Sequence, residues 1–281
     1  MKTILVPFQD DPIAIAALEQ ACLVAERFDS HIEGLFIARP PQIIEAEGIA
    51  LAGAYVSQLK DEWRRRADEA RERFEQLMAG RGVQMRALIA EGPGVSASWR
   101  DMEGPEGQVI GDYGRLFDLI VVGRSGESAL VDWQVLCEAA FFESGKPTLV
   151  AGAEPRPMLG ETVVVSWNGS TEAARTIALG MPFLEGAGKL VVLADSDVSV
   201  PGPSGQDVTT HLRRHGMDAQ YLEIASGSRS GGEAILEECT KLGADLLLKG
   251  AYTHNRLRQL VFGGATRHIL SHAELPVLMA H

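Results

Sequence analysis

The chain has 281 residues, of which 46% are hydrophobic, and it carries a formal net charge of −12 at pH 7. This length suits one large domain or two of about 140 residues each. The acidic balance argues against a nucleic-acid binder, which would need a basic face, but it leaves room for a small anion at a local site.

The three cysteines, Cys22, Cys137 and Cys239, are odd in number, far apart and without a CxxC pair. We therefore expect buried thiols in a reducing cytosol rather than disulfides or a zinc knuckle. The opening MKTILVPF leads into a strand without the features of a signal peptide. No apolar run reaches the roughly 18 residues of a membrane span, so the sequence predicts a cytoplasmic protein.

After a first strand at 3–8, the first half carries a long, charged amphipathic helix at 58–81. Its apolar stripe comprises Leu59, Trp63, Ala67, Ala70, Phe74 and Leu77. Arginines 64–66 stand among acidic residues at helical spacing, which favours a solvated face of paired charges over a basic patch. Residues 40–57 are small and apolar and suit either a lid or an interface element; the pattern does not decide between them.

The chain repeats itself. TILVPF at 3–8 matches TVVVSW at 162–167, DLIVVG at 118–123 matches DLLLKG at 245–250, and the order is kept. GKPTLV at 145–150 likewise resembles ELPVLM at 274–279. We interpret this as a tandem duplication. The predicted domains are 1–152 and 160–281, joined by a linker that contains two prolines.

Short β-branched runs alternate with helical patterns in each half. In the second half we expect strands near 162–167, 189–194, 219–224, 244–249 and 276–280, and helices near 171–183, 206–215, 230–242 and 263–273. Strands that are apolar on both faces and separated by helices indicate a parallel sheet covered on both sides. The predicted fold class is α/β, with two doubly wound, Rossmann-like domains, each a five-stranded parallel sheet with helices on both faces.

Ligands in such folds bind at the carboxyl ends of strands. Asn168 follows one strand, Gly250 ends another, and Gly263-Gly264 opens a helix thirteen residues later. Glycines there let backbone amides approach a ligand, and a helix N-terminus suits phosphate.

The spacing of Gly250, two residues, Thr253, nine residues and Gly263-Gly264, with the strand and turn of VVVSWNGS at 163–170, resembles the universal stress protein family. The resemblance covers both halves. It implies an adenine-nucleotide site with a Gly, two residues, Gly, nine residues, Gly and Ser/Thr motif, and an acidic residue after the first strand. It also implies that the last strands of the halves, at 145–150 and 275–280, pair to form an intrachain pseudo-dimer.

The chain departs from the family pattern at three positions. Thr253 replaces the second glycine, Gly264 replaces the phosphate-binding hydroxyl, and Asn168 replaces the acidic residue. The resemblance still implies a degenerate site in the second half, made of Asn168, Gly250, Thr253, Gly263, Gly264, Ala265 and Thr266. Its ligand would be ATP or another adenine nucleotide, with no metal beyond accompanying Mg²⁺. The alternative is that these glycines serve only turns and tight helix–sheet packing.

The first half is further from the motif. Gly123-Arg-Ser-Gly126 keeps two glycines, but the following helix start reads Trp133-Gln-Val-Leu-Cys137. Gln9 and Asp10 would replace the acidic contact there. Asp10-Asp11-Pro12 also resembles the acidic pair of a phosphoacceptor receiver, but an N-cap followed by a first-turn proline is the interpretation we prefer.

His268 and His272 stand one helical turn apart, a spacing that can bind zinc, but no carboxylate or cysteine is placed beside them. No motif for catalysis appears, so weak ATP hydrolysis is not favoured. The resemblance implies a stress-response protein with one degenerate nucleotide site; the alternative is a nucleotide-independent interaction module or binder of another small ligand. A protein partner and further homodimerisation both stay open.

Overall fold

The computed structural model describes residues 1–39, 53–88, 92–124, 133–152, 158–251 and 264–281. The elements of the first half are β1 (Thr3–Pro7), α1 (Pro12–Phe28), β2 (His31–Ala38), α2 (Gly53–Gly80), β3 (Gln84–Met85), β4 (Ser96–Glu103), α3 (Glu106–Tyr113), a 3-10 turn (Gly114–Leu116), β5 (Leu119–Val122), α4 (Trp133–Phe142) and β6 (Thr148–Val150). Those of the second half are β7 (Thr162–Trp167), α5 (Thr171–Glu185), β8 (Lys189–Asp195), α6 (Gly205–Arg214), β9 (Ala219–Ile224), α7 (Gly231–Leu242), β10 (Leu246–Gly250), α8 (Gly264–His272) and β11 (Val277–Ala280). All nine elements predicted for the second half are confirmed, with bounds within two residues of those expected.

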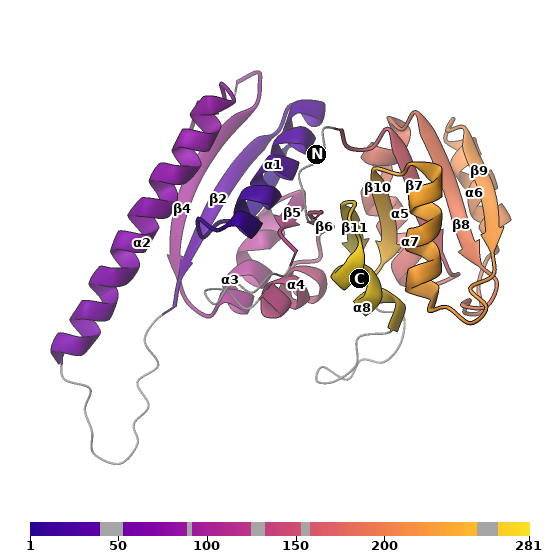
Figure 1. The fold of residues 1–281 in the computed structure, drawn as a ribbon. Helices are drawn as coiled ribbons and strands as arrows, with labels where there is room; N and C mark the ends of the chain where they lie inside the picture. The colour runs from indigo at the N-terminus through magenta and orange to yellow at the C-terminus, as the bar shows by residue number, and fades with distance from the viewer. Residues whose placement is uncertain (40–52, 89–91, 125–132, 153–157, 252–263) are drawn as a thin grey trace, which may run out of the picture.

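All the strands join one sheet, in the order β3-β4-β2-β1-β5-β6-β11-β10-β7-β8-β9. Neighbouring strands are parallel within each half, and β6 and β11 pair antiparallel. The order β4-β2-β1-β5-β6 is repeated by β9-β8-β7-β10-β11, and β3 adds one short strand that the sequence did not predict. The predicted doubly wound halves and the pairing of their last strands are therefore confirmed, with the two sheets merged into one (Figure 1).

Helices cover both faces of this sheet, because most strand residues on both faces are apolar. One face packs against buried side chains of α1, α2, α5 and α6, including Leu18, Phe74 and Phe183. The other packs against α3, α4, α7 and α8, including Ile110 and Ile269. No described helix is both long and apolar enough to cross a membrane.

The cysteines belong to these cores. Cys22, Cys137 and Cys239 are buried and free. Burial raises the pKa of the Cys22 and Cys239 thiols to about 12, which keeps them protonated and unreactive. The predicted buried thiols are confirmed.

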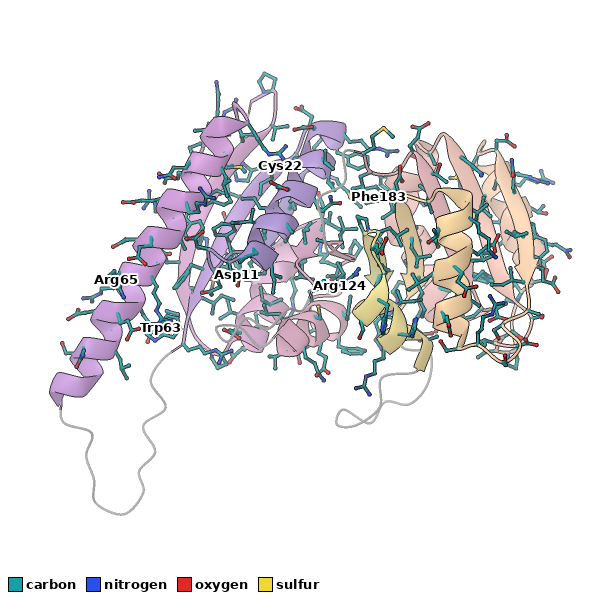
Figure 2. The ribbon with its side chains drawn as sticks, viewed as in Figure 1. Asp11, Cys22, Trp63, Arg65, Arg124 and Phe183 are labelled. Atoms are coloured by element: carbon teal, nitrogen blue, oxygen red, sulfur yellow. The ribbon has the colours of Figure 1, made fainter. Side chains whose placement is uncertain are left out.

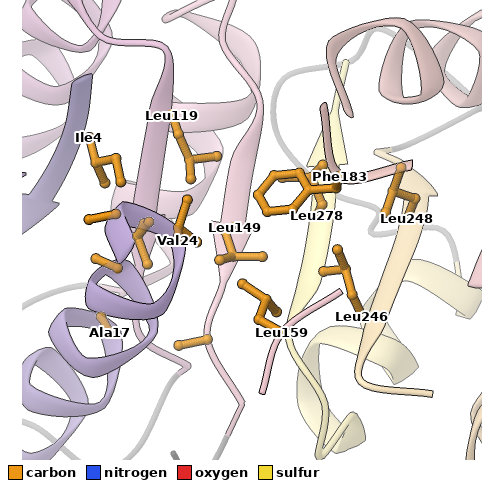
Figure 3. Close-up of a cluster of buried hydrophobic side chains, with 14 of the residues drawn as sticks. Ile4, Ala17, Val24, Leu119, Leu149, Leu159, Phe183, Leu246, Leu248 and Leu278 are labelled. Atoms are coloured by element: carbon orange, nitrogen blue, oxygen red, sulfur yellow. The ribbon is translucent and has the colours of Figure 1, made fainter. Parts of the chain in front are cut away.

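The two halves share a core across their junction. Leu149 of β6 lies with Leu278 of β11 in one buried cluster, which continues to both sides (Figure 3). Arg27 at the end of α1 donates hydrogen bonds to the carbonyls of Leu159 at 2.8 Å and Phe183 at 3.3 Å. These contacts tie the end of the linker and the end of α5 to the first half.

The long helix α2 lies along the outer edge of the first half beside β4 (Figure 1). It begins at Gly53, five residues before the predicted start, so it takes in the last part of 40–57. Phe74 is fully buried and packs against Trp99 of β4. Gly34 of β2 makes room for both rings, since a Cβ there would lie 2.7 Å from Phe74 and 2.9 Å from Trp99.

The outer face of α2 is charged and internally paired, as predicted. Arg64 pairs with Asp61 at 3.5 Å, Arg65 with Glu69 at 3.0 Å and Arg66 with Glu62 at 2.6 Å. Arg65 projects away from the sheet, whereas Trp63 lies on the side that faces it (Figure 2).

Candidate functional site

The carboxyl ends of β10, β7 and β8 lie side by side in the second half. The register pairs Lys249 with Ser166 and Trp167 with Ala194. Gly250, Asn168 and Asp195 therefore occupy neighbouring positions at one edge of the sheet. The structure brings Asn168 and Gly250 together, as the sequence predicted.

Gly250 is required by packing. A Cβ at this position would lie 2.6 Å from the backbone nitrogen of Ala173 and 2.8 Å from the carbonyl carbon of Glu172, in the first turn of α5. Gly123 holds the same relation to Ile13 of α1 in the first half. The packing interpretation thus accounts for both strand-end glycines without a ligand.

Asn168 takes part in the turn that leads into α5. Its Oδ1 accepts a hydrogen bond from the backbone nitrogen of Ser170 at 3.2 Å, and Ser170 caps the helix by accepting from Ala173 at 3.2 Å. Gly169 between them has φ +85°, a left-handed conformation that glycine adopts without strain. Asn168 remains partly exposed, so its amide can also meet a ligand.

Trp167 packs in the core rather than standing open at this edge. Its side chain is buried, and Nε1 donates to the carbonyl of Pro203 at 2.8 Å. Trp167 therefore has a core role at this edge.

The first turn of α8 supplies the remaining described residues of the predicted site. Gly264 is exposed, and a Cβ there would meet no atom of the described residues within 4 Å, so their packing does not demand a glycine. Ala265 is partly buried, and Thr266 is buried. Thr253 and Gly263 lie outside the described residues.

Lys249, which the sequence analysis missed, lies beneath this first turn. Its side chain is buried, and Nζ donates to Thr266 Oγ1 and to the carbonyl of Gly250, both at 3.0 Å. Burial alone lowers the pKa of Lys249 to about 8. No described carboxylate forms an ion pair with it. The available signal was a lysine within the otherwise apolar strand DLLLKG.

Asp195, also missed, ends β8 next to Asn168. Its Oδ1 accepts from the backbone nitrogens of Asp197 at 3.0 Å and Ser226 at 3.2 Å. Oδ2 is buried without a hydrogen-bond partner among the described residues. A Cβ on Gly231 would lie 3.3 Å from it, so the carboxylate sits at the N-terminus of α7, where the helix dipole favours negative charge.

The first half lacks these groups. The matching strand registers place Pro7, Ile37 and Val122 at the positions of Ser166, Asp195 and Lys249 in the second half. The edge that carries a buried carboxylate and a buried ammonium in one half is therefore apolar in the other.

The residues expected to replace an acidic contact in the first half have other partners. Gln9 donates to the carbonyl of Ile37 at 3.4 Å, and Asp10 pairs with Arg73 at 3.7 Å. Asp11 is the N-cap of α1 and accepts from Ala14 at 2.7 Å, with Pro12 at the first position, so that prediction is confirmed. Figure 2 shows Asp11 at this end of the helix. Gly126 falls outside the described part of the chain.

A second buried polar group, on β2 and β4, is fully satisfied. Ser98 Oγ donates to Glu33 at 2.9 Å, so it must accept from His31 Nε2 at 2.8 Å. Neutral His31 therefore accepts from Ser96 at Nδ1, 2.9 Å away, and burial lowers its pKa. Glu33 also pairs with Arg100 at 3.0 Å. Because each of these groups has a partner, the network needs no ligand.

The histidines on α8 contact one another. The rings of His268 and His272 stack with centroids 4.2 Å apart, and His272 Nδ1 lies 3.0 Å from the carbonyl oxygen of His268. Within the described ranges, no cluster of three or more His, Cys, Asp or Glu side chains could hold a metal ion.

Comparison with known proteins finds a family match in the second half of the chain. Residues 183–281, from the end of α5 through β11, match the universal stress protein family. The chain contains a universal stress protein domain. The universal stress protein Slr1230 of Synechocystis is 29% identical over 172 residues, which is 58% of this chain and 57% of that relative, so less than two thirds of the relative's length is covered.

Solved universal stress proteins share the fold over the whole chain. One from Archaeoglobus fulgidus is similar with a TM-score of 0.72 at 15% identity, covering 99% of this chain and 97% of that one. A putative universal stress protein from Pseudomonas aeruginosa is similar with a TM-score of 0.54 at 19% identity, covering 100% and 93%. At these identities the likeness concerns the fold.

Proposed function

We propose that this universal stress protein is a cytoplasmic stress-response protein of two tandem domains, 1–152 and 160–281, that binds one adenine nucleotide. The site would lie at the carboxyl edge of the second domain, with Asn168, Asp195, Gly250, Gly264, Ala265 and Thr266 around it. Thr253 and Gly263 are added from the sequence motif. The proposed role is ligand binding rather than a reaction.

One observation carries the proposal: the buried Asp195 Oδ2 has no donor among the described residues, and it stands beside Asn168. A buried carboxylate oxygen without a donor is costly, so it favours a ligand that donates hydrogen bonds. The family resemblance calls for an acidic residue that meets the adenosine. Asp195 offers this carboxylate from the neighbouring strand, where Asn168 cannot.

The test is to denature the purified protein, identify released small molecules by mass spectrometry, and measure the affinity of the emptied protein for ATP, ADP and AMP. Asp195→Asn keeps Oδ1 as an acceptor and turns the other oxygen into a donor. Loss of one charged hydrogen bond of about 1.5 kcal/mol weakens binding about tenfold. Asp112→Asn, at an exposed carboxylate paired with Arg115, is the matched control and should change nothing.

The alternative is a nucleotide-independent interaction module, and it is favoured by the purely packing role of Gly250. No nucleotide in the extract and no binding of any of the three would reject the nucleotide site and leave this alternative. Equal affinity in Asp195→Asn and the parent protein would reject Asp195 as the adenosine contact.

A further inference from the structure

The sheet ends at β9 in the second half, and no described strand pairs with the outer side of β9 (Figure 1). The backbone groups of successive residues alternate in direction along a strand. The carbonyl of Ile224 accepts from the backbone nitrogen of Ser196, just after β8, at 2.9 Å, so it faces β8. The N–H and C=O groups of Tyr221 and Glu223 therefore point away from β8, toward the open side.

A contact of α6 supports this direction. The carbonyl of Ala219 belongs to the same outward-facing set, and Arg213 Nε reaches it from α6 at 2.8 Å. Within the described ranges, the backbone N–H and C=O groups of Tyr221 and Glu223 have no hydrogen-bond partner. This edge therefore offers two donors and two acceptors to another strand.

A second copy of β9 fits these groups. When two β9 strands lie antiparallel about a two-fold axis at Leu222, Tyr221 of each copy stands opposite Glu223 of the other. Each such pair exchanges two hydrogen bonds, so all the free groups of Tyr221 and Glu223 are used. The bond from Arg213 to Ala219 stays in place. A contact between identical surfaces closes a dimer and leaves no surface for a filament.

The side chains that meet in this register are compatible. Leu222 stands opposite Leu222 of the second copy, and Ile224 stands opposite Gln220. Tyr221 stands opposite Glu223, a pair that already forms within each chain, where the tyrosine hydroxyl donates to the carboxylate at 2.5 Å. Leu222 and Ile224 are only partly buried in one chain, so their pairing removes apolar surface from water.

The opposite edge of the sheet differs in charge. β3 pairs with only the first two residues of β4, and by the same alternation Trp99, Asp101 and Glu103 face outward there. Two-fold pairing of β4 about residue 100, 101 or 102 would set Arg100 against Arg100, Asp101 against Asp101, or Asp101 against Glu103. Like charges directly opposite are destabilising, and charged edge residues are a known protection against such pairing. β9 lacks this protection.

We propose that β9 is a homodimer interface, at which two copies of this chain pair their β9 strands antiparallel about Leu222. The sheets of the two molecules then form one continuous sheet. This contact lies at the far end of the second half from the junction of β6 with β11, which joins the halves of a single chain.

The test is sedimentation velocity of the full chain over a series of concentrations at physiological salt, with amide hydrogen exchange at both ends of the series. The expected result is a reversible dimer whose fraction rises with concentration. Amide exchange over residues 219–224 should slow as the dimer forms, whereas exchange over residues 99–103 should not change. A chain that stays monomeric throughout the series rejects the proposal.

Two proline variants locate the contact. Glu223→Pro removes one outward-facing N–H from each chain and so breaks two of the four inter-chain bonds, while a proline is tolerated where the N–H of an edge strand faces solvent. The dissociation constant should rise by at least about tenfold. Glu103→Pro is the matched control, because it makes the same change at an outward-facing glutamate of β4, and it should leave the dissociation constant unchanged.

A charge exchange tests the two-fold axis itself. Leu222→Lys and Leu222→Glu each place like charges opposite one another, so each variant alone should be monomeric. An equal mixture of the two should recover a dimer, because opposite charges then meet at the axis. Recovery also shows that both variants are folded. A dimer that persists in Glu223→Pro, or a mixture of folded Leu222 variants that stays monomeric, would overturn the assignment to β9.

Discussion

Replacing Lys249 with methionine in the ligand-free protein should change how stability depends on pH. The buried amine has a pKa of about 8, against the usual 10.5 that applies in the unfolded chain. Each unit of pKa difference is worth 1.36 kcal/mol, so holding the charged amine in the fold costs about 3 kcal/mol. The folded state binds fewer protons than the unfolded state between these two pKa values. The free energy of unfolding therefore rises as pH increases from 8 to 10.5, and below pH 8 the full cost of the buried charged amine is present.

Methionine removes the charge but also two hydrogen bonds, which are worth about 1 kcal/mol each. Lys249→Met should therefore be more stable than the parent by about 1 kcal/mol at pH 7, and less stable by about 2 kcal/mol near pH 10.5. Urea unfolding of both proteins at the two pH values measures this change of sign. Lys241→Met, at an exposed lysine of α7, should show no such crossover. A difference between Lys249→Met and the parent that stays constant from pH 7 to pH 10.5 would refute the buried, uncompensated charge.

Two further predictions concern glycines. Gly34→Ala should lower the free energy of unfolding by about 1–3 kcal/mol, because its Cβ would meet Phe74 and Trp99. Adding Phe74→Leu to this variant should recover part of that loss, as measured by urea unfolding. Losses from the two substitutions that simply add would contradict the contact. Gly250→Ala should lower the melting temperature even without ligand, because its Cβ would meet backbone of α5. Gly264→Ala, in contrast, should leave the melting temperature unchanged and weaken AMP binding. Equal thermal effects of these last two substitutions would show that packing does not distinguish them.

The fold could be predicted from local signals. The strands are apolar on both faces, and the helices begin at recognisable caps such as Ser230, whose side chain accepts from Glu233 at 3.1 Å. The repeat then predicted the same fold for both halves. β3 was missed because it has only two residues, both exposed, and so shows no apolar run.

The site was harder to predict, because sequence motifs describe glycine positions and spacing and do not describe which side chains become buried. The motif led to Gly250 and Asn168, which the structure brings together, but it gave no reason to consider the strand interior. Lys249 resembles an ordinary strand-end lysine until burial is known, and Asp195 resembles a turn residue until its Oδ2 is found without a donor. The burial of both side chains depends on how the helices pack on the sheet, which is a property of the tertiary structure.

The two similar halves belong to one chain, and β6 and β11 join them by antiparallel pairing. In a symmetric pair of identical chains, every substitution occurs twice, so the two carboxyl edges must stay alike. A single gene that encodes both halves removes this constraint, since each edge can change independently. Such freedom permits proline, isoleucine and valine at one edge where the equivalent positions of the other edge carry serine, aspartate and lysine. The apolar edge can then serve as a scaffold that stays folded whether or not ligand is present, while selection for affinity acts on the polar edge alone.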